Sequence, residues 1–350
     1  MATGTVPAGS RPGSIDVEGL TLREPRRLER LLGPELARII YGLFSNRLSI
    51  AGMIIVLGFI LVALAAPVLA PPLKGRDPTV IPRDGFGPEP KPPGTVWRSS
   101  PPPVPGWYTT LTGQDQWVHI LGTTAGQFDI WYGVIWGART ALFVGVVIVG
   151  ITVIIGVIVG SVASYFGGWI DDVLMRITEI FMAFPFLLAA LTLASILVPA
   201  FGRGIWPAMI ALIVFGWMQY ARLVRSDILS VKERDYVMAA RVIGARDSRI
   251  LGRHILPNAI FPTLVLASLD IGSIVLSFAA LSFLGVGTEV GYADWGQIVS
   301  FARNWILTLD KQWWIVVYPG LTLILFGLGW NLIGDALRDI LDPKLRGARG

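Results

Sequence analysis

The sequence predicts an all-α integral membrane protein with six transmembrane helices, because of its composition and its apolar runs. Hydrophobic residues make up 53% of the chain and charged residues only 15%, whereas soluble domains carry roughly 25% charged residues. A helix needs ~18 to 20 apolar residues to cross the hydrocarbon core of a bilayer. Six runs reach this length, and only the fifth contains a charge, Asp270: Leu48 to Leu73, Thr140 to Ile170, Ile180 to Gly202, Gly204 to Ala221, Ile255 to Thr288 and Gln312 to Gly334.

The chain before the first run divides into two parts. Residues 1–24 are rich in Gly, Ser, Pro and charge and are predicted to form a disordered tail. Residues 25–47 place leucines and isoleucines on one helical face beside several arginines. This pattern predicts a cytoplasmic amphipathic helix that either lies on the lipid surface or packs on a partner subunit. Residues 48–72 are predicted to be the first transmembrane helix, a retained anchor that is too long for a cleaved signal segment.

Residues 73–137 are predicted to form an external segment whose composition differs from the rest of the chain. Thirteen of the 24 prolines fall between Pro67 and Pro105, and three tryptophans are spaced through or after them. Proline restricts φ and removes a backbone donor, so we expect an irregular segment laid over the outer surface without a core of its own. The segment either contacts an extracytoplasmic partner or is an insertion with no direct role.

Residues 138–337 are predicted to form a core of five helices. Gly156, Gly160 and Ser164 stand four apart, which predicts close contact with another helix. Pro185, after Phe184, should kink the third span, and such a kink either shapes a cavity or is an inert packing feature. A carboxylate within a span is costly, so Asp270 should face protein or a wet cavity and have a partner. It either recognises cargo, as a cation or a peptide amino terminus, or stabilises the bundle.

The most informative segment is the connection after the fourth span, residues 222–258. Two short helices are expected here, separated by Gly244, which allows a sharp turn. Ala239 and Ala240 on the first helix offer a surface with little side chain, suited to fit closely inside a groove of another protein.

The distribution of basic residues predicts the orientation of the chain. Twenty of the 29 Lys and Arg residues fall in the two ends and in the segments after the second and fourth spans. Basic residues near helix ends resist translocation, so both termini and residues 222–258 are predicted to be cytoplasmic, and residues 338–350 form a cytoplasmic tail. No stretch mixes clustered bases with stacking aromatics, so no nucleic acid is expected as a partner.

Several kinds of site are excluded by the residues that are missing. The chain contains no Cys, so it cannot form a thiolate metal site. His119 and His254 are its only histidines, so the sequence also lacks the two-histidine helix motif of zinc proteases. It also has no Gly-Lys pair, and therefore lacks the lysine-bearing phosphate loop of an ATPase. We expect no catalytic residue and no metal ligand in this chain.

The connection carries a resemblance to a known family. Ala239 and Ala240, then Gly244, then the stretch from His254 to Asn258 resemble the EAA loop of ABC importer permease subunits. Residues 121–346 resemble more narrowly the C-type permease of dipeptide and oligopeptide importers. The pieces that carry this resemblance include Tyr165 to Trp169, Phe184 with Pro185, Leu281 to Gly285, and Asn331 to Asp335. The chain departs from the family pattern at Met238 and Phe278, where the family has glutamate, and after Thr123.

The resemblance implies a fold, a role and partners. It implies the type I ABC importer permease fold, in a non-catalytic subunit of the plasma (inner) membrane of a prokaryote. The implied partners are a homologous B-type permease, two ATPase subunits that bind ATP and Mg, an extracytoplasmic substrate-binding protein and membrane lipids; this chain itself would hold no cofactor. The resemblance places ATPase docking on the cytoplasmic loop, for which we select Tyr236, Ala239, Ala240, Arg241, Gly244 and Ala245.

The cargo implied by the resemblance is a di- or oligopeptide, and Asp270, Phe184 and Pro185 are our candidates for its path. Nickel or another small solute is an alternative cargo within the same architecture. An ion-coupled secondary transporter is a further alternative, although it would normally show several ionisable groups inside the membrane and paired hydrophobic repeats.

Overall fold

The computed structural model describes residues 41–44 and 46–341. The tail predicted for residues 1–24, most of the amphipathic helix predicted for 25–47, and most of the tail predicted for 338–350 lie outside the described residues. Within them, five helices are long and apolar enough to cross a membrane, and a bent pair adds a sixth span if it is counted as one. The prediction of an all-α membrane protein is confirmed.

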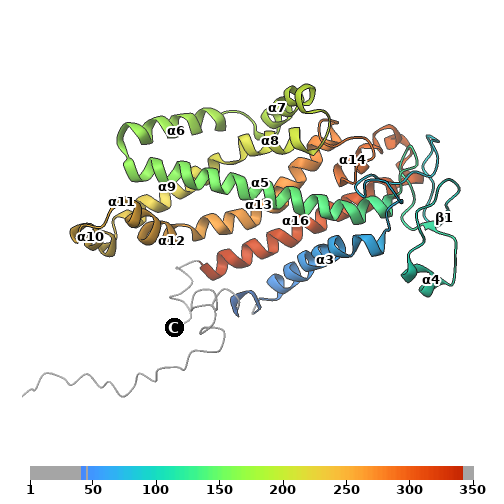
Figure 1. Cartoon of the computed structure of the whole chain (residues 1–350), viewed down its shortest axis with the longest axis horizontal. Coiled ribbons are helices and arrows are strands. Elements are labelled where there is room, and N and C mark those ends of the chain that lie inside the picture. The colour runs from blue at the N-terminus through green and yellow to red at the C-terminus, as the bar shows by residue number, and fades with distance from the viewer. Residues whose placement is uncertain (1–40, 45, 342–350) are drawn as a thin grey trace, which may run out of the picture.

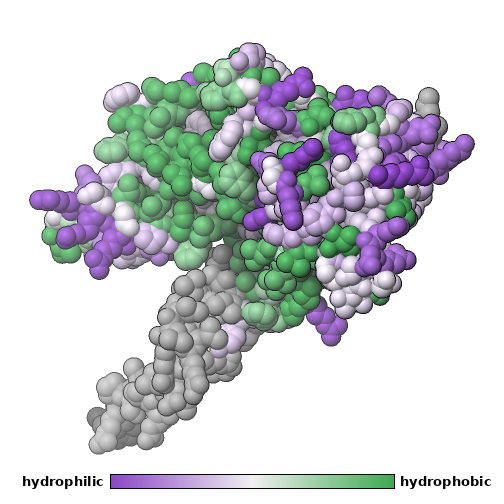
Figure 2. All heavy atoms as spheres, turned by 45° about the vertical axis from the view of Figure 1, so that its right-hand side comes forward, coloured by the Kyte–Doolittle hydropathy of each residue, from purple (hydrophilic) through white to green (hydrophobic). Residues whose placement is uncertain are grey.

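The spanning helices lie side by side in one bundle (Figure 1). They are α3 (Arg47–Leu69), α5 (Ile130–Phe166), the bent pair α6 (Gly168–Met182) and α7 (Phe186–Phe201), the consecutive helices α8 (Ile205–Gly216) and α9 (Met218–Lys232), α13 (Phe261–Phe283) and α16 (Trp314–Leu341). Figure 2 shows hydrophobic residues over much of the helical part of the visible face, and hydrophilic residues gathered toward both ends. This distribution fits a body that lies in lipid with its two ends in water.

Small residues let the helices approach closely. A Cβ atom added at Gly156 would lie 2.3 Å from Tyr220 Cβ, and one at Gly160 would lie 2.4 Å from the carbonyl oxygen of Ala221. Both contacts join α5 to α9, as the spacing of small residues predicted. On the other side of the bundle, a Cβ at Gly272 of α13 would lie 3.0 Å from the Cα of Gly327 in α16. Glycines therefore allow close approach of the helices at both of these crossings.

The third span is broken rather than gently kinked. Helices α6 and α7 meet at 87°, with Ala183 and Pro185 as the residues flanking the break. Proline cannot donate to the preceding turn, so the helix breaks near Pro185, where a kink was predicted, and the change in direction is large. Helix α6 begins at Gly168, ahead of the apolar run from Ile180 that was predicted as this span.

The fourth span extends further than the apolar run predicted. The helix continues past Ala221 to Lys232, because α9 keeps an apolar face against the bundle where its other face becomes charged. After it come α10 (Asp235–Val242), α11 (Asp247–Arg249), the π-helix η2 (Ile250–Ile255) and α12 (Leu256–Ala259). Residues 233–260 form one end of the molecule, called here the loop end (Figure 1).

The opposite end is formed by residues 70–129, called here the cap (Figure 1). It contains α4 (Gly106–Thr112) and the antiparallel strands β1 (Thr95–Val96) and β2 (Val118–His119). Trp97, Tyr108 and Trp117 are buried together, with the rings of Tyr108 and Trp117 edge to face at 4.8 Å. The prediction that this segment has no core of its own is therefore wrong, because its aromatic residues turn inward and bury enough area to make one.

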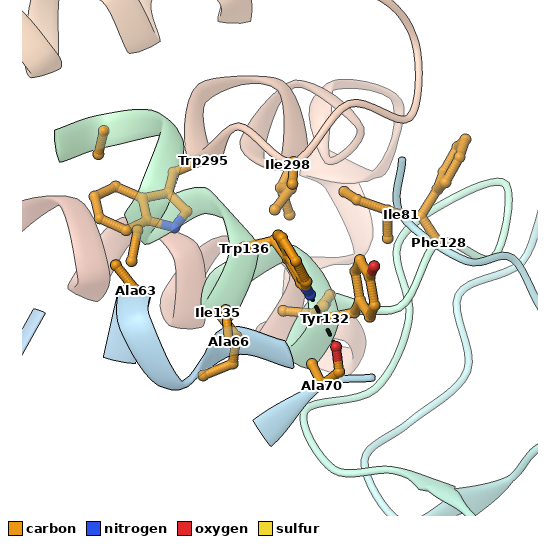
Figure 3. Packing of buried hydrophobic residues seen from close by; sticks show 14 of the residues in the cluster. Ala63, Ala66, Ala70, Ile81, Phe128, Tyr132, Ile135, Trp136, Trp295 and Ile298 are labelled. Carbon is orange, nitrogen blue, oxygen red and sulfur yellow. Dashed lines mark hydrogen bonds between the residues drawn. The ribbon is translucent and has the colours of Figure 1, made fainter. Parts of the chain in front are cut away.

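Side chains of α5 fasten the cap to the bundle. Trp136 Nε1 donates to the carbonyl oxygen of Ala70 at 2.8 Å, and the ring of Tyr132 stacks beside it (Figure 3). Tyr132 Oη donates to the carbonyl oxygen of Pro78 at 2.8 Å. The chain between the fifth and sixth spans lies at the same end, as α14 (Trp295–Ser300), the 3₁₀ helix η3 (Arg303–Thr308) and α15 (Leu309–Gln312).

Candidate functional site

A cavity of about 440 Å³ lies in the bundle where two spans are interrupted. One interruption is the break between α6 and α7, and the other is the junction of α8 and α9 at Trp217. Helix α13 and Thr152 of α5 complete the wall. The lining residues are Thr152, Phe181, Met182, Phe184, Phe186, Phe215, Gly216, Met218, Gln219, Tyr220, Asp270, Ser273, Ile274 and Ser277. Interrupted helices are tolerated at membrane depth where they line a cavity.

Asp270 is the one acidic or basic residue among these lining residues. Its Oδ2 accepts hydrogen bonds from Gln219 Nε2 at 2.5 Å and from Tyr220 Oη at 2.6 Å. Its Oδ1 has only a long contact of 3.4 Å from Ser273 Oγ. Asp270 was predicted to face either protein or a cavity and to have a partner. The structure shows the partner and places the residue at both, because its Oδ2 is hydrogen-bonded to protein side chains and the residue also lines the cavity.

The structure brings Phe184 to this cavity together with Asp270, whereas Pro185 is not among the lining residues. Pro185 is the N-cap residue of α7. It affects the cavity indirectly, because it lies at the break between α6 and α7. Sequence reasoning missed Gln219 and Tyr220. The available signal was a pair of polar side chains at the end of an otherwise apolar run.

A second, charged cavity of about 890 Å³ lies between α6 and α9. Its lining residues are Asp172, Val173, Met175, Arg176, Glu179, Arg222, Arg225 and Ser226. Arg225 makes a bidentate pair with Asp171 at 2.6 and 2.5 Å. Arg222 Nη1 lies 3.6 Å from the sulfur of Met182, which lines the first cavity. The first cavity, at the start of α9, is thus lined mainly by apolar and aromatic residues, whereas the second cavity, further along α9 toward the loop end, is lined mainly by charged residues.

A surface hollow of about 540 Å³ lies at the loop end. Four of the predicted docking residues line it, namely Tyr236, Ala239, Ala240 and Ala245, together with Ile243, Arg249, Arg253 and His254. Arg241 and Gly244 are not among its lining residues. Gly244 instead makes the turn between α10 and α11 with φ at +77°, a left-handed conformation that favours glycine.

Sequence reasoning also missed two exposed apolar residues at the hollow, of which Ile243 lines it and Val242 precedes it in the chain. Val242 and Ile243 are 86% and 84% exposed. Large apolar side chains exposed together, beyond the spanning helices, are typical of a surface that binds another protein. The signal in the sequence was an apolar pair directly before the turning glycine.

The loop end is firmly attached to the spanning helices. Val237 of α10 and Ile250 of η2 are buried in one apolar cluster with Val224 and Ile228 of α9. Lys232 Nζ donates to the carbonyl oxygens of Ser164 and Tyr165, both at 3.2 Å. A force on α10 therefore reaches α9 and the end of α5 through direct contacts.

The cap holds a separate polar cluster around His119. Its Nδ1 lies 2.7 Å from Asp129 Oδ2 and its Nε2 lies 3.2 Å from Asp84 Oδ2. Burial alone would raise the pKa of Asp84, but hydrogen bonds from Lys91 and from the backbone N–H groups of Ser99 and Arg98 outweigh it and lower the pKa to about 2. Across residues 41–44 and 46–341, no grouping of three or more His, Asp or Glu side chains suits a metal ion.

Known proteins resemble this chain over most of its length. Residues 152–347 match the family model described as the binding-protein-dependent transport system inner membrane component. Residues 36–81 match the model of the N-terminal transmembrane domain of oligopeptide transport permease C.

Two curated relatives show how far the similarity extends. The dipeptide transport system permease protein DppC of Alkalihalophilus pseudofirmus is 35% identical over 302 residues, which cover 86% of this chain and 88% of that protein. The oligopeptide transport system permease protein OppC of Bacillus subtilis is 32% identical over 302 residues, covering 86% and 87%. A solved structure of the MetNI methionine ABC transporter, in inward-facing conformations, shares the fold, with a TM-score of 0.50, 18% identity, and coverage of 60% of this chain and 97% of that chain.

Proposed function

This chain belongs to the family of binding-protein-dependent transport system inner membrane components, and we propose that it forms one half of the membrane path of an ATP-driven peptide importer. It is a multi-pass protein of the cell membrane. Its relatives DppC and OppC are named for dipeptide and oligopeptide transport, which favours a peptide over nickel and over an ion-coupled mechanism. The proposed path runs through the cavity of about 440 Å³ that Phe184 and Asp270 line.

The observation that carries this proposal is that helix α9 contributes both to the cavity of about 440 Å³ and to the apolar cluster under α10 at the loop end. Gln219 and Tyr220 in its first turn line the cavity, and Val224 and Ile228 further along pack on Val237 of α10. In the proposed mechanism, two ATPase subunits close on ATP and displace α10, and α9 carries that displacement to the cavity wall. The binding energy of the closed ATPases then shifts the permease between arrangements that open the cavity to opposite sides.

The proposal also includes a second permease, a substrate-binding protein and ATPase subunits as partners. A homologous second permease would cover the side of the cavity near α7, where Phe184 and Leu188 are 59% and 60% exposed. A substrate-binding protein would deliver cargo to the cap, with the loop end and both termini in the cytoplasm, as the distribution of basic residues favours. ATP and Mg would be bound by the ATPase subunits, because this sequence contains no phosphate-loop lysine motif.

Ala239→Trp tests the docking surface. Ala239 is exposed and lines the hollow at the loop end, so the indole fills space that an ATPase would occupy without disturbing the core of the bundle. Met238→Trp is the matched control, because Met238 is 48% exposed and does not line the hollow. We expect Ala239→Trp to lose copurifying ATPase and ATP-dependent peptide uptake in proteoliposomes, while Met238→Trp keeps both. Normal assembly and uptake by Ala239→Trp would refute this docking surface.

A further inference from the structure

The cavity contains one ionisable group, and no cationic side chain lines the wall beside it. Asp270 is the one acidic or basic group among the lining residues, and the donors that hold its Oδ2, from Gln219 and Tyr220, are neutral. Within the described part of the chain, no salt bridge of 4.0 Å or less joins Asp270 to Lys, Arg or His. A carboxylate placed at membrane depth without a cation is costly, and such groups commonly mark a site that takes one.

The hydrogen bonds leave one oxygen of this carboxylate available. Oδ2 already accepts two short hydrogen bonds, whereas Oδ1 has only the 3.4 Å contact from Ser273 Oγ. The same hydroxyl lies closer, at 3.1 Å, to the carbonyl oxygen of Asp270. Each carboxylate oxygen offers about two acceptor positions, so Oδ1 retains the capacity to accept from a ligand while Oδ2 keeps the group oriented.

The rest of the wall suits a cation that is attached to an apolar body. Phe181, Phe184, Phe186 and Phe215 line the cavity, and the rings of Phe181 and Phe215 lie 5.7 Å apart. Aromatic faces attract ammonium groups and also accept apolar side chains. The volume of about 440 Å³ falls within the range of about 300 to 1,000 Å³ for small-ligand pockets.

We infer that this cavity recognises the free amino terminus of a peptide, with the α-ammonium group donating to Asp270 Oδ1 and the first side chain lying among the phenylalanines. The inference rests on the proposed function, since it assumes that a peptide passes through this cavity. It adds a chemical requirement: the passing peptide carries an unblocked amino group. Acetylation removes both the positive charge and two of the donors that the site would use.

Equilibrium binding to the purified transport complex tests this requirement. The complex is held in lipid nanodiscs without its substrate-binding protein, so that only the membrane path is probed. The probes are radiolabelled Phe-Ala dipeptide and its N-acetyl form. A hydrogen bond to a charged group in a poorly hydrated site predicts that the wild-type complex binds the free dipeptide about tenfold to a hundredfold more tightly than the acetylated one.

Three variants make the test specific. Asp270→Asn keeps the shape and still accepts from Gln219 and Tyr220, so the complex should assemble, and binding of the free dipeptide should fall to the level of the N-acetyl dipeptide. Asp270→Glu keeps the charge and should retain a preference for the free amino group. Asp115→Asn, the same acid-to-amide change at an exposed residue of the cap, should leave both affinities unchanged. Equal effects of Asp270→Asn on both dipeptides, or no effect on either, would overturn the inference.

ATP-dependent uptake, measured with the binding protein present, separates this inference from the proposed function. If the wild-type complex takes up neither dipeptide, the proposed function fails and the inference fails with it. If the wild-type complex takes up the free dipeptide but Asp270→Asn shows no selective loss in the binding experiment, only the role of Asp270 is overturned.

Discussion

At the scale of single residues, a buried histidine links the loop of the cap to the start of α5. His119 lies between Asp84, which holds the cap loop through the backbone N–H groups of Arg98 and Ser99, and Asp129, which accepts from the backbone N–H of Tyr132 at the start of α5. The imidazole ring also packs against Trp97, with the ring centroids 4.2 Å apart and the planes tilted by 36°. The composition of the segment showed the tryptophans, but it could not show that they turn inward around a buried polar pair, because those contacts join residues 10 and 35 positions apart.

The low pKa of Asp84 predicts an acid-sensitive cap. The folded-state pKa of about 2 lies below the ordinary value of 3.8, so the stabilisation from the ionised carboxylate is complete above pH ~4 and is lost as the pH falls toward 2. Tryptophan fluorescence of the purified protein should report loosening of the cap over this interval. Asp84→Asn should lack this transition and be less stable at neutral pH. An unchanged transition in the variant would contradict this role of Asp84.

At the scale of elements, the contact between α5 and α9 positions one wall of the cavity. The spacing of small residues predicted a close contact, which the structure confirms, because spacing along a helix is a local property. The sequence could not show that the partner is α9, nor that Tyr220 crosses to Asp270, fifty residues away. The break at Pro185 was predictable because proline acts on its own turn, whereas the angle of 87° depends on what both halves pack against.

Gly160→Ala should weaken this helix contact. The added methyl would lie 2.4 Å from the carbonyl oxygen of Ala221, so α5 and α9 must separate, at a cost of about 1 to 3 kcal/mol. Gly150→Ala is the matched control, since a Cβ there meets nothing within 4 Å, and alanine in a helix is favoured over glycine by about 0.5 to 1 kcal/mol. Thermal unfolding of the purified protein should show a lower Tm for the first variant only; equal shifts for both would refute the contact.

At the scale of the whole molecule, the turn at Gly244 separates the α10 surface from the helices that anchor it. Its φ of +77° is strained for a β-branched residue but tolerated by asparagine. Gly244→Val should therefore shift α10 at a strain of about 1 to 3 kcal/mol and uncouple ATP hydrolysis from uptake, while Gly244→Asn should retain most of the coupling. The ratio of peptide taken up to ATP hydrolysed, measured in proteoliposomes, checks this prediction. Equal ratios in the two variants would contradict it.

The transmembrane spans were predictable from the sequence, but the contacts that join the loop end to the cavity were not. Apolar runs and the distribution of charge predicted the spans, because each depends on local composition, and Gly244 predicted the turn. Of the two alanines predicted to offer an open surface, Ala239 is exposed, whereas Ala240 is buried in the apolar cluster of the loop end. The extension of α9 to Lys232 was not predicted, since a charged helical face can still pack its other face on the bundle. That extension is what joins the loop end to the cavity.

The central claim is that the cavity opens alternately to the two ends of the molecule as the ATPases act on α10. The chain has no cysteine, so Ser277→Cys introduces a single thiol into the cavity wall, which a membrane-impermeant maleimide can label in proteoliposomes. Labelling of this chain should occur from the loop-end side without nucleotide and from the cap side when the complex is trapped with ATP and vanadate. The same accessibility in both states, or labelling from neither side, would contradict the account.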